Sequence, residues 1–115
     1  MKFAIQKNIL LENLTYVTKA ISIKNIIPIL NGIKFELTEE GLSLTASDSD
    51  LTIKTFIEAK EITNIDKTGV IIIQSKFITE IIRKMPTDII NFEVIDGLKI
   101  KIFTENNQYN LNCLD

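Results

Sequence analysis

Residues 27 to 51 read IPILNGIKFELTEEGLSLTASDSDL, and the rest of the chain is arranged around them. Apolar side chains alternate with polar ones in two runs, which is the pattern of strands with one buried face. The alternating apolar residues are Ile33, Phe35 and Leu37, then Leu42, Leu44 and Ala46. Glu39-Glu40-Gly41 separates these runs, and Asp48-Ser49-Asp50 precedes a third strand over Leu51–Glu58. The sequence therefore predicts a three-stranded antiparallel meander.

The segments before and after the meander have other patterns. Lys2–Gln6 alternates and predicts a short strand. A helix is predicted from Asn8, a possible N-cap, because apolar residues recur there with helical spacing. This stripe comprises Leu10, Leu14, Val17 and Ile21. Ser22–Ile27 is predicted to be a connection ending before Pro28, and the polar stretch Ala59–Lys67 to be a loop.

The second half repeats the first. Val70–Ile73 predicts a buried strand, and Ser75 is a good N-cap for a helix over Lys76–Met85 that Pro86 ends. Three alternating strands follow, with an Asp96-Gly97 hairpin signal between the first two. The apolar residues are Phe77, Ile78, Ile81, Ile82 and Met85 on the helix, then Ile90, Phe92 and Val94, then Leu98, Ile100 and Ile102, and finally Tyr109, Leu111 and Cys113. The fold class is therefore α+β, with duplicated strand-helix-strand-strand-strand units and two helices on one face of antiparallel sheets.

Length and composition set further bounds. At 115 residues the chain is one domain, 1–115, with an ordinary balance of 45% hydrophobic and 24% charged residues. No long apolar run predicts a membrane span or signal peptide, so a cytoplasmic protein is expected. Its single cysteine agrees with a reducing compartment. The net charge of −2 means that any nucleic-acid binding must come from a local basic face.

The residues offer little for catalysis. The chain has no histidine, and Cys113 lies in an alternating strand, which favours an inert buried thiol over a nucleophile. Asp48 and Asp50 fit turn formation better than a cation site, because the later glutamate of a calcium loop is missing. We therefore expect no enzyme, metal or cofactor.

The basic residues offer a second kind of site. If the two helices lie side by side, their outward faces form a positive strip suited to phosphates. The residues concerned are Lys19, Lys24, Lys76, Arg83 and Lys84. Alternatively, Lys19, Arg83 and Lys84 only complement helix C-termini. No aromatic residue is expected to interleave these charges, which argues against stacking on single strands.

Five stretches of the chain together resemble a known family. They are MKFAIQKNILLENL, IPILNGIKFEL, SLTASDSDLTI, SKFITEIIRKMP and YNLNCL. In this order they resemble the N-terminal domain of the bacterial DNA polymerase sliding clamp, the beta subunit of polymerase III, across essentially the whole chain. The resemblance implies a ring of two chains with three such domains each, in which helices line the hole and sheets form the outside.

The resemblance also implies roles for single residues. Lys24, four positions before the proline of IPIL, is expected to touch duplex DNA, as are Lys76 and Arg83. Lys19 and Lys84 are added to the predicted DNA-binding set from the basic strip alone. Tyr109 and Leu111 are expected at the contact with a second clamp chain, flanked by Asn106 and Gln108 where relatives often carry basic residues. By their alternation alone, Tyr109 and Leu111 also fit ordinary core residues of a strand.

The resemblance implies a non-catalytic replication factor that encircles duplex DNA without sequence specificity and makes the replicative polymerase processive. The second and third clamp domains are absent from these 115 residues, and with them the expected contacts with polymerase and clamp loader. One alternative is a standalone adaptor that binds proteins through a sheet edge. The last is an enzyme that uses Asp48 and Asp50 with a metal.

Overall fold

The structure, a computed structural model, describes residues 1–21, 31–48, 50–96 and 98–114. The first half contains β1 (Lys2–Gln6), α1 (Lys7–Val17), η1 (Thr18–Ala20), β2 (Gly32–Thr38), β3 (Gly41–Ser47), β4 (Thr52–Glu58), η3 (Ala59–Glu61) and β5 (Ile62–Asp66). The second half contains β6 (Gly69–Gln74), α2 (Ser75–Lys84), β7 (Ile89–Ile95), β8 (Lys99–Phe103) and β9 (Gln108–Asn112). The predicted meander and both helices are therefore present, while the predicted connection 22–27 lies outside the described residues.

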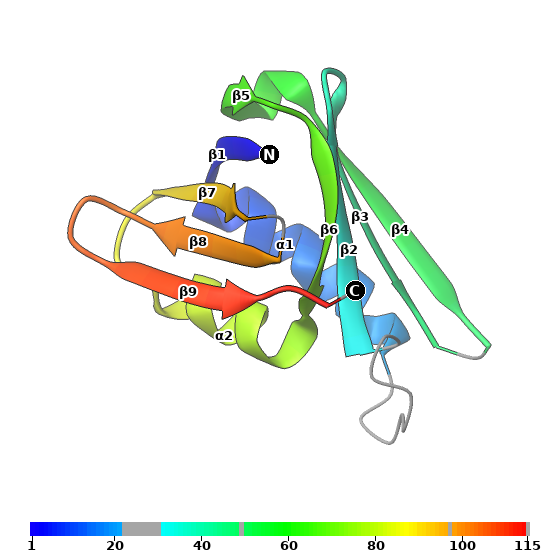
Figure 1. The fold of residues 1–115 in the computed structure, drawn as a ribbon. Helices are drawn as coiled ribbons and strands as arrows, with labels where there is room; N and C mark the ends of the chain where they lie inside the picture. Colours follow the sequence, from blue (N-terminus) through cyan, green and yellow to red (C-terminus); the bar gives the residue numbers. More distant parts are fainter. Residues whose placement is uncertain (22–30, 49, 97, 115) are drawn as a thin grey trace.

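The strands form two antiparallel sheets that exchange their first strands. One sheet has the order β5-β1-β7-β8-β9, and the other has the order β4-β3-β2-β6. Thus β1 pairs with β7 from the second half, and β6 pairs with β2 from the first half. Figure 1 shows the two sheets on either side of the molecule. Because each sheet contains strands from both halves, the two repeated units form one domain rather than two separate ones.

One hydrophobic core joins both sheets to both helices. The predicted helical stripes supply much of it, since Leu10, Leu14 and Val17 of α1 are fully buried. Phe92 of β7 stacks on Phe3 of β1 with ring centroids 4.8 Å apart, and it also lies 6.2 Å from Phe35 of the other sheet. The apolar faces predicted from the alternation therefore meet in a common interior.

The two helices lie against each other and against the sheets. α1 packs on β1, β3 and β4, while α2 packs on β6 and on α1. In Figure 1 the two helices run in roughly opposite directions, α1 behind β7 and β8 and α2 beneath β9. The predicted side-by-side arrangement of the two helices is confirmed.

Two local predictions about segment type and position are wrong. Ala59–Lys67 is not a plain loop, because Ile62–Asp66 forms β5 at the edge of the larger sheet and pairs with β1. The register of β5 with β1 shifts along the ladder, and Asn64 has a φ of 55°. Buried and exposed residues therefore do not alternate regularly along β5, and the sequence shows no strand pattern there. Phe77 does not join the buried face of α2, since its side chain is 46% exposed.

Both predicted N-caps are also wrong. α1 begins at Lys7 and α2 at Ser75, and the residues before them, Gln6 and Gln74, make no side-chain capping hydrogen bond. The amide oxygen of Asn8 instead accepts a hydrogen bond from the adjacent N–H of Ile9. In both halves the helix follows directly on the strand, so no separate capping residue stands between them.

The predicted turn at Glu39-Glu40-Gly41 connects β2 to β3, with Thr38 opposite Gly41 in the ladder. Gly41 has a φ of +150°, and a Cβ at this position would collide with the carbonyl oxygen of Ile57 in β4. The close approach of β4 therefore requires glycine here.

Candidate nucleic-acid interface

Lys7 connects the beginning of α1 to the end of α2. Its Nζ donates hydrogen bonds to the carbonyl oxygens of Arg83, at 3.0 Å, and Met85, at 2.7 Å. Arg83 lies in the last turn of α2 and Met85 is the residue that caps this helix. The carbonyl groups at a helix C-terminus have no partner within the helix and carry partial negative charge. The partly buried residue Lys7, at the start of α1, thus satisfies carbonyl groups at the end of α2.

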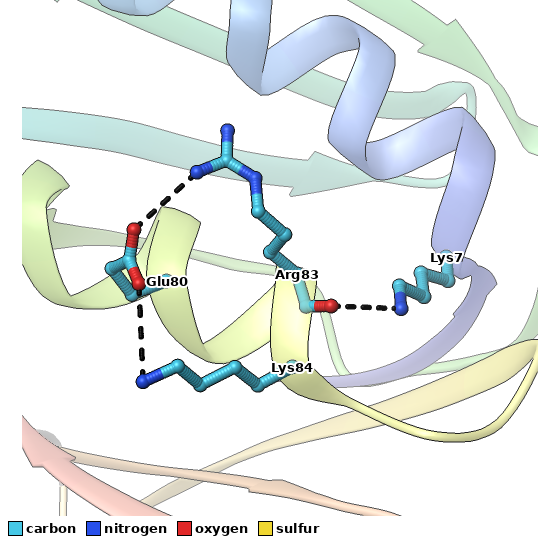
Figure 2. Close-up of polar contacts among 4 residues, drawn as sticks. All are labelled: Lys7, Glu80, Arg83 and Lys84. Carbon is cyan, nitrogen blue, oxygen red and sulfur yellow. Dashed lines mark hydrogen bonds and ion pairs between the residues drawn. The ribbon is translucent and has the colours of Figure 1, made fainter.

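The last turn of α2 presents two of the predicted DNA-binding cations. Arg83 Nη1 lies 3.3 Å from Glu80 Oε1, and Lys84 Nζ lies 3.9 Å from Glu80 Oε2. Figure 2 shows one carboxylate oxygen of Glu80 toward each cation, with the Arg83 side chain above Glu80 and the Lys84 side chain below it. Both cations are more than half exposed, so solvent and solutes can reach them.

Two further predicted cations lie beside exposed aromatic rings. Lys19 Nζ is 5.6 Å from the ring centroid of Tyr16, and Lys76 Nζ is 4.9 Å from that of Phe77. These distances are within the range of cation–π attraction. The prediction that no aromatic side chain accompanies the basic residues is therefore wrong, because Tyr16 and Phe77 are both nearly half exposed on the helices.

Four of the predicted basic residues lie on or beside the two helices, and two of them are held together by one acidic side chain. Arg83 and Lys84 share Glu80 at the end of α2, while Lys76 lies in the first turn of α2 and Lys19 directly follows α1. Lys24, the residue assigned most directly to DNA by the family resemblance, lies outside the described residues.

The other polar candidates have structural explanations. The Asp48 carboxylate accepts hydrogen bonds from the backbone N–H groups of Asp50 and Leu51, each at 2.8 Å, which confirms its predicted turn-forming role. Burial raises the pKa of the Cys113 thiol, which disfavours the reactive thiolate. Within the described ranges, no three His, Cys, Asp or Glu side chains gather where they could hold a metal ion. In the same ranges, no helix has the length and apolar character needed to cross a membrane.

The predicted subunit contact falls on β9, one of the two edge strands of its sheet in the described structure. Tyr109 and Leu111 lie opposite Ile102 and Ile100 of β8, so they extend the buried face toward the edge. Tyr109 is 36% exposed and Leu111 is half-buried, so neither is a fully enclosed core residue. Gln108 lies on β9 with its amide bonded to Asn110, and Asn106 is exposed in the preceding turn.

The backbone of β9 leaves hydrogen-bonding groups at the open edge. The N–H of Cys113 donates to the carbonyl of Leu98. Because hydrogen-bonded and non-hydrogen-bonded pairs alternate along an antiparallel ladder, the backbone N–H and C=O groups of the odd-numbered residues of β9 point toward β8. The N–H groups of Gln108, Asn110 and Asn112 therefore point away from β8. This edge can accept another strand.

The comparisons with known proteins agree with this architecture. The family model for the DNA polymerase III beta subunit, N-terminal domain, matches residues 1–115. The chain belongs to this family. A curated relative, the beta sliding clamp of Bacillus subtilis, is 41% identical over 119 residues, which cover 100% of this chain and 32% of the relative. The chain thus spans about a third of the length of the curated relatives it matches.

Solved structures of family members have the same fold. The DNA polymerase sliding clamp from Bacillus subtilis superposes with a TM-score of 0.94 at 41% identity, covering 100% of this chain and 31% of that one. The beta subunit from DNA polymerase of Streptococcus pyogenes also gives a TM-score of 0.94, at 30% identity, covering 100% of this chain and 30% of that one. The fold predicted from the alternation and from the resemblance is confirmed.

Two residues of this interface were missed by sequence reasoning. Lys7 carried no motif, and its contact with α2 joins residues 76 and 78 positions apart. The contacts of Glu80 could have been predicted from the sequence. Glu80 precedes Arg83 by three positions and Lys84 by four, and residues with these spacings are neighbours on a helix surface.

We expect Lys7→Met to lower the free energy of unfolding by about 1–2 kcal/mol, because two charge-assisted hydrogen bonds to the end of α2 are lost. Urea unfolding followed by circular dichroism measures this change. Lys2→Met is the matched control: Lys2 is 3.9 Å from Glu93 in an exposed ion pair, so its loss should cost less than about 0.5 kcal/mol. Equal effects of the two substitutions would contradict the role assigned to Lys7.

Proposed function

We propose that this chain is the N-terminal domain of a replicative DNA sliding clamp, which encircles duplex DNA and keeps the polymerase on its template without performing chemistry. The observation that carries this proposal is the match of all 115 residues to beta sliding clamps in sequence and in fold. The helix pair with its exposed cations is the surface we assign to DNA.

A ring that retains DNA by enclosing it needs weak contacts, because strong or sequence-specific contacts would stop it from sliding. Arginine and lysine side chains that meet phosphates supply contacts of this kind, and these contacts weaken with salt. The net charge of −2 gives no general attraction to DNA, so the local cations must supply it. We assign this role to Arg83, Lys84, Lys76 and Lys19, and to Lys24 by the family resemblance.

The open edge of β9 is the surface we assign to the neighbouring clamp chain. A strand added there would hydrogen-bond to the outward N–H groups, and the side chains of Tyr109 and Leu111 would continue the apolar face across the contact. Asn106 and Gln108 lie beside them as neutral polar neighbours, so this contact relies on backbone pairing and apolar packing. The same edge supports the second candidate function, an adaptor that binds other proteins by strand addition.

We expect Arg83→Gln with Lys84→Gln to weaken duplex binding about three- to tenfold at low salt, because two phosphate contacts are lost. Chemical-shift titration of the 115-residue chain with a short duplex measures weak binding of this kind. The charge-matched control is Lys54→Gln with Lys60→Gln, two exposed lysines on β4 and η3. If both pairs of substitutions weaken binding equally, or if duplex DNA leaves the helix signals of the wild type unchanged, the assignment of the helix face to DNA is wrong.

We expect the wild-type chain to self-associate weakly at high protein concentration through β9, and Asn110→Pro to reduce this association. Proline removes an outward N–H but leaves the ladder to β8 intact. Asn110→Ser keeps the N–H and serves as the control. Sedimentation equilibrium distinguishes them: association that is the same in the proline and serine variants would show that β9 is not the pairing edge.

A further inference from the structure

The carboxylate of Glu80 lies within ion-pair distance of both Arg83 and Lys84 at the end of α2. Its two carboxylate oxygens lie 3.3 Å from the guanidinium group and 3.9 Å from the ammonium group (Figure 2). Lys19 and Lys76 lie against aromatic rings instead, which carry no net charge. Only at Glu80, within the described part of the helix pair, does an acidic side chain form an ion pair with the proposed DNA-binding cations.

We propose that Glu80 sets the strength of the DNA contact by competing with backbone phosphates for Arg83 and Lys84. This inference rests on the proposed function, because it assumes that these two cations meet duplex DNA. With Glu80 in place the end of α2 carries one net positive charge rather than two. A phosphate that binds here must displace a carboxylate that is already in position.

The geometry makes this competition reversible. All three side chains are at least 57% exposed, so the ion pairs are screened by water and separate easily. The spacings i,i+3 and i,i+4 keep Glu80 within reach of both cations whenever a phosphate leaves. Each contact with DNA can therefore break and be replaced by an internal one, which suits a protein that moves along its ligand.

The ion pairs of Glu80 differ from the other described ion pairs in their location on a helix. Glu93, Glu36 and Glu58 pair with lysines on strands or on η3, so none of these pairs lies on α1 or α2. Glu58 is a close match for comparison, since it forms an exposed pair with Lys60 at 3.2 Å. Removing its charge changes the net charge of the protein by the same amount as removing that of Glu80.

The test compares Glu80→Gln with Glu58→Gln by chemical-shift titration of the 115-residue chain with a short duplex at low salt. We expect Glu80→Gln to tighten binding about two- to fivefold, the range given by the loss of exposed ion pairs, and Glu58→Gln to leave it nearly unchanged. Circular dichroism should show both variants folded like the wild type. Equal binding by the two variants would overturn the inference.

A second arm identifies the cations through which Glu80 acts. In a background with Arg83→Gln and Lys84→Gln, the substitution Glu80→Gln should no longer tighten binding, because the groups it releases are gone. The same gain in that background would overturn the inference and indicate a general charge effect. If wild-type helix signals do not respond to duplex DNA, the proposed function of this face fails; if they respond but Glu80→Gln changes nothing, only the role of Glu80 fails.

Discussion

The exchange of first strands between the two halves determines how the helices and the core are arranged. β1 leads directly into α1 and β6 leads directly into α2, so each helix starts from a strand that is paired with the other half. This connection brings the helices together, and the apolar stripes of both then close one core. Lys7 adds a polar contact at the point where the start of one helix meets the end of the other.

The site that we propose for DNA is an exposed surface of the helix pair rather than a pocket. Short helices with one buried stripe leave their remaining sides exposed. The exposed sides of α2 carry Arg83, Lys84 and Lys76, and Lys19 lies in η1 after α1. Glu80 and the two aromatic rings keep these cations in contact with the protein when no ligand is present. Such a surface suits many weak contacts with a regular anionic polymer, and the sheets leave strand edges for contacts between domains.

Much of this architecture could be predicted from the residues. Strict alternation at Ile33, Phe35 and Leu37 and the stripe of Leu10, Leu14 and Val17 each report a single buried face, and the structure has both. Pairing between strands that are distant in the sequence leaves no such local pattern. The pairing of β1 with β7 and of β6 with β2 could therefore not be predicted from the sequence. β5 was not predicted because its irregular pairing with β1 leaves no regular alternation in the sequence. The contact of Lys7 could not be predicted because it depends on where the end of α2 lies in the folded molecule.

Native-state hydrogen exchange in increasing denaturant tests the central claim, that strand exchange makes the two halves one cooperative unit. The account predicts that the most protected amides of β1, β7 and β8 and those of β2, β3 and β6 open with the same free energy and the same denaturant dependence. If amides of the β2–β3–β6 sheet opened at a clearly lower free energy than those of the β1–β7–β8 sheet, the two sheets would unfold separately and the claim would be contradicted.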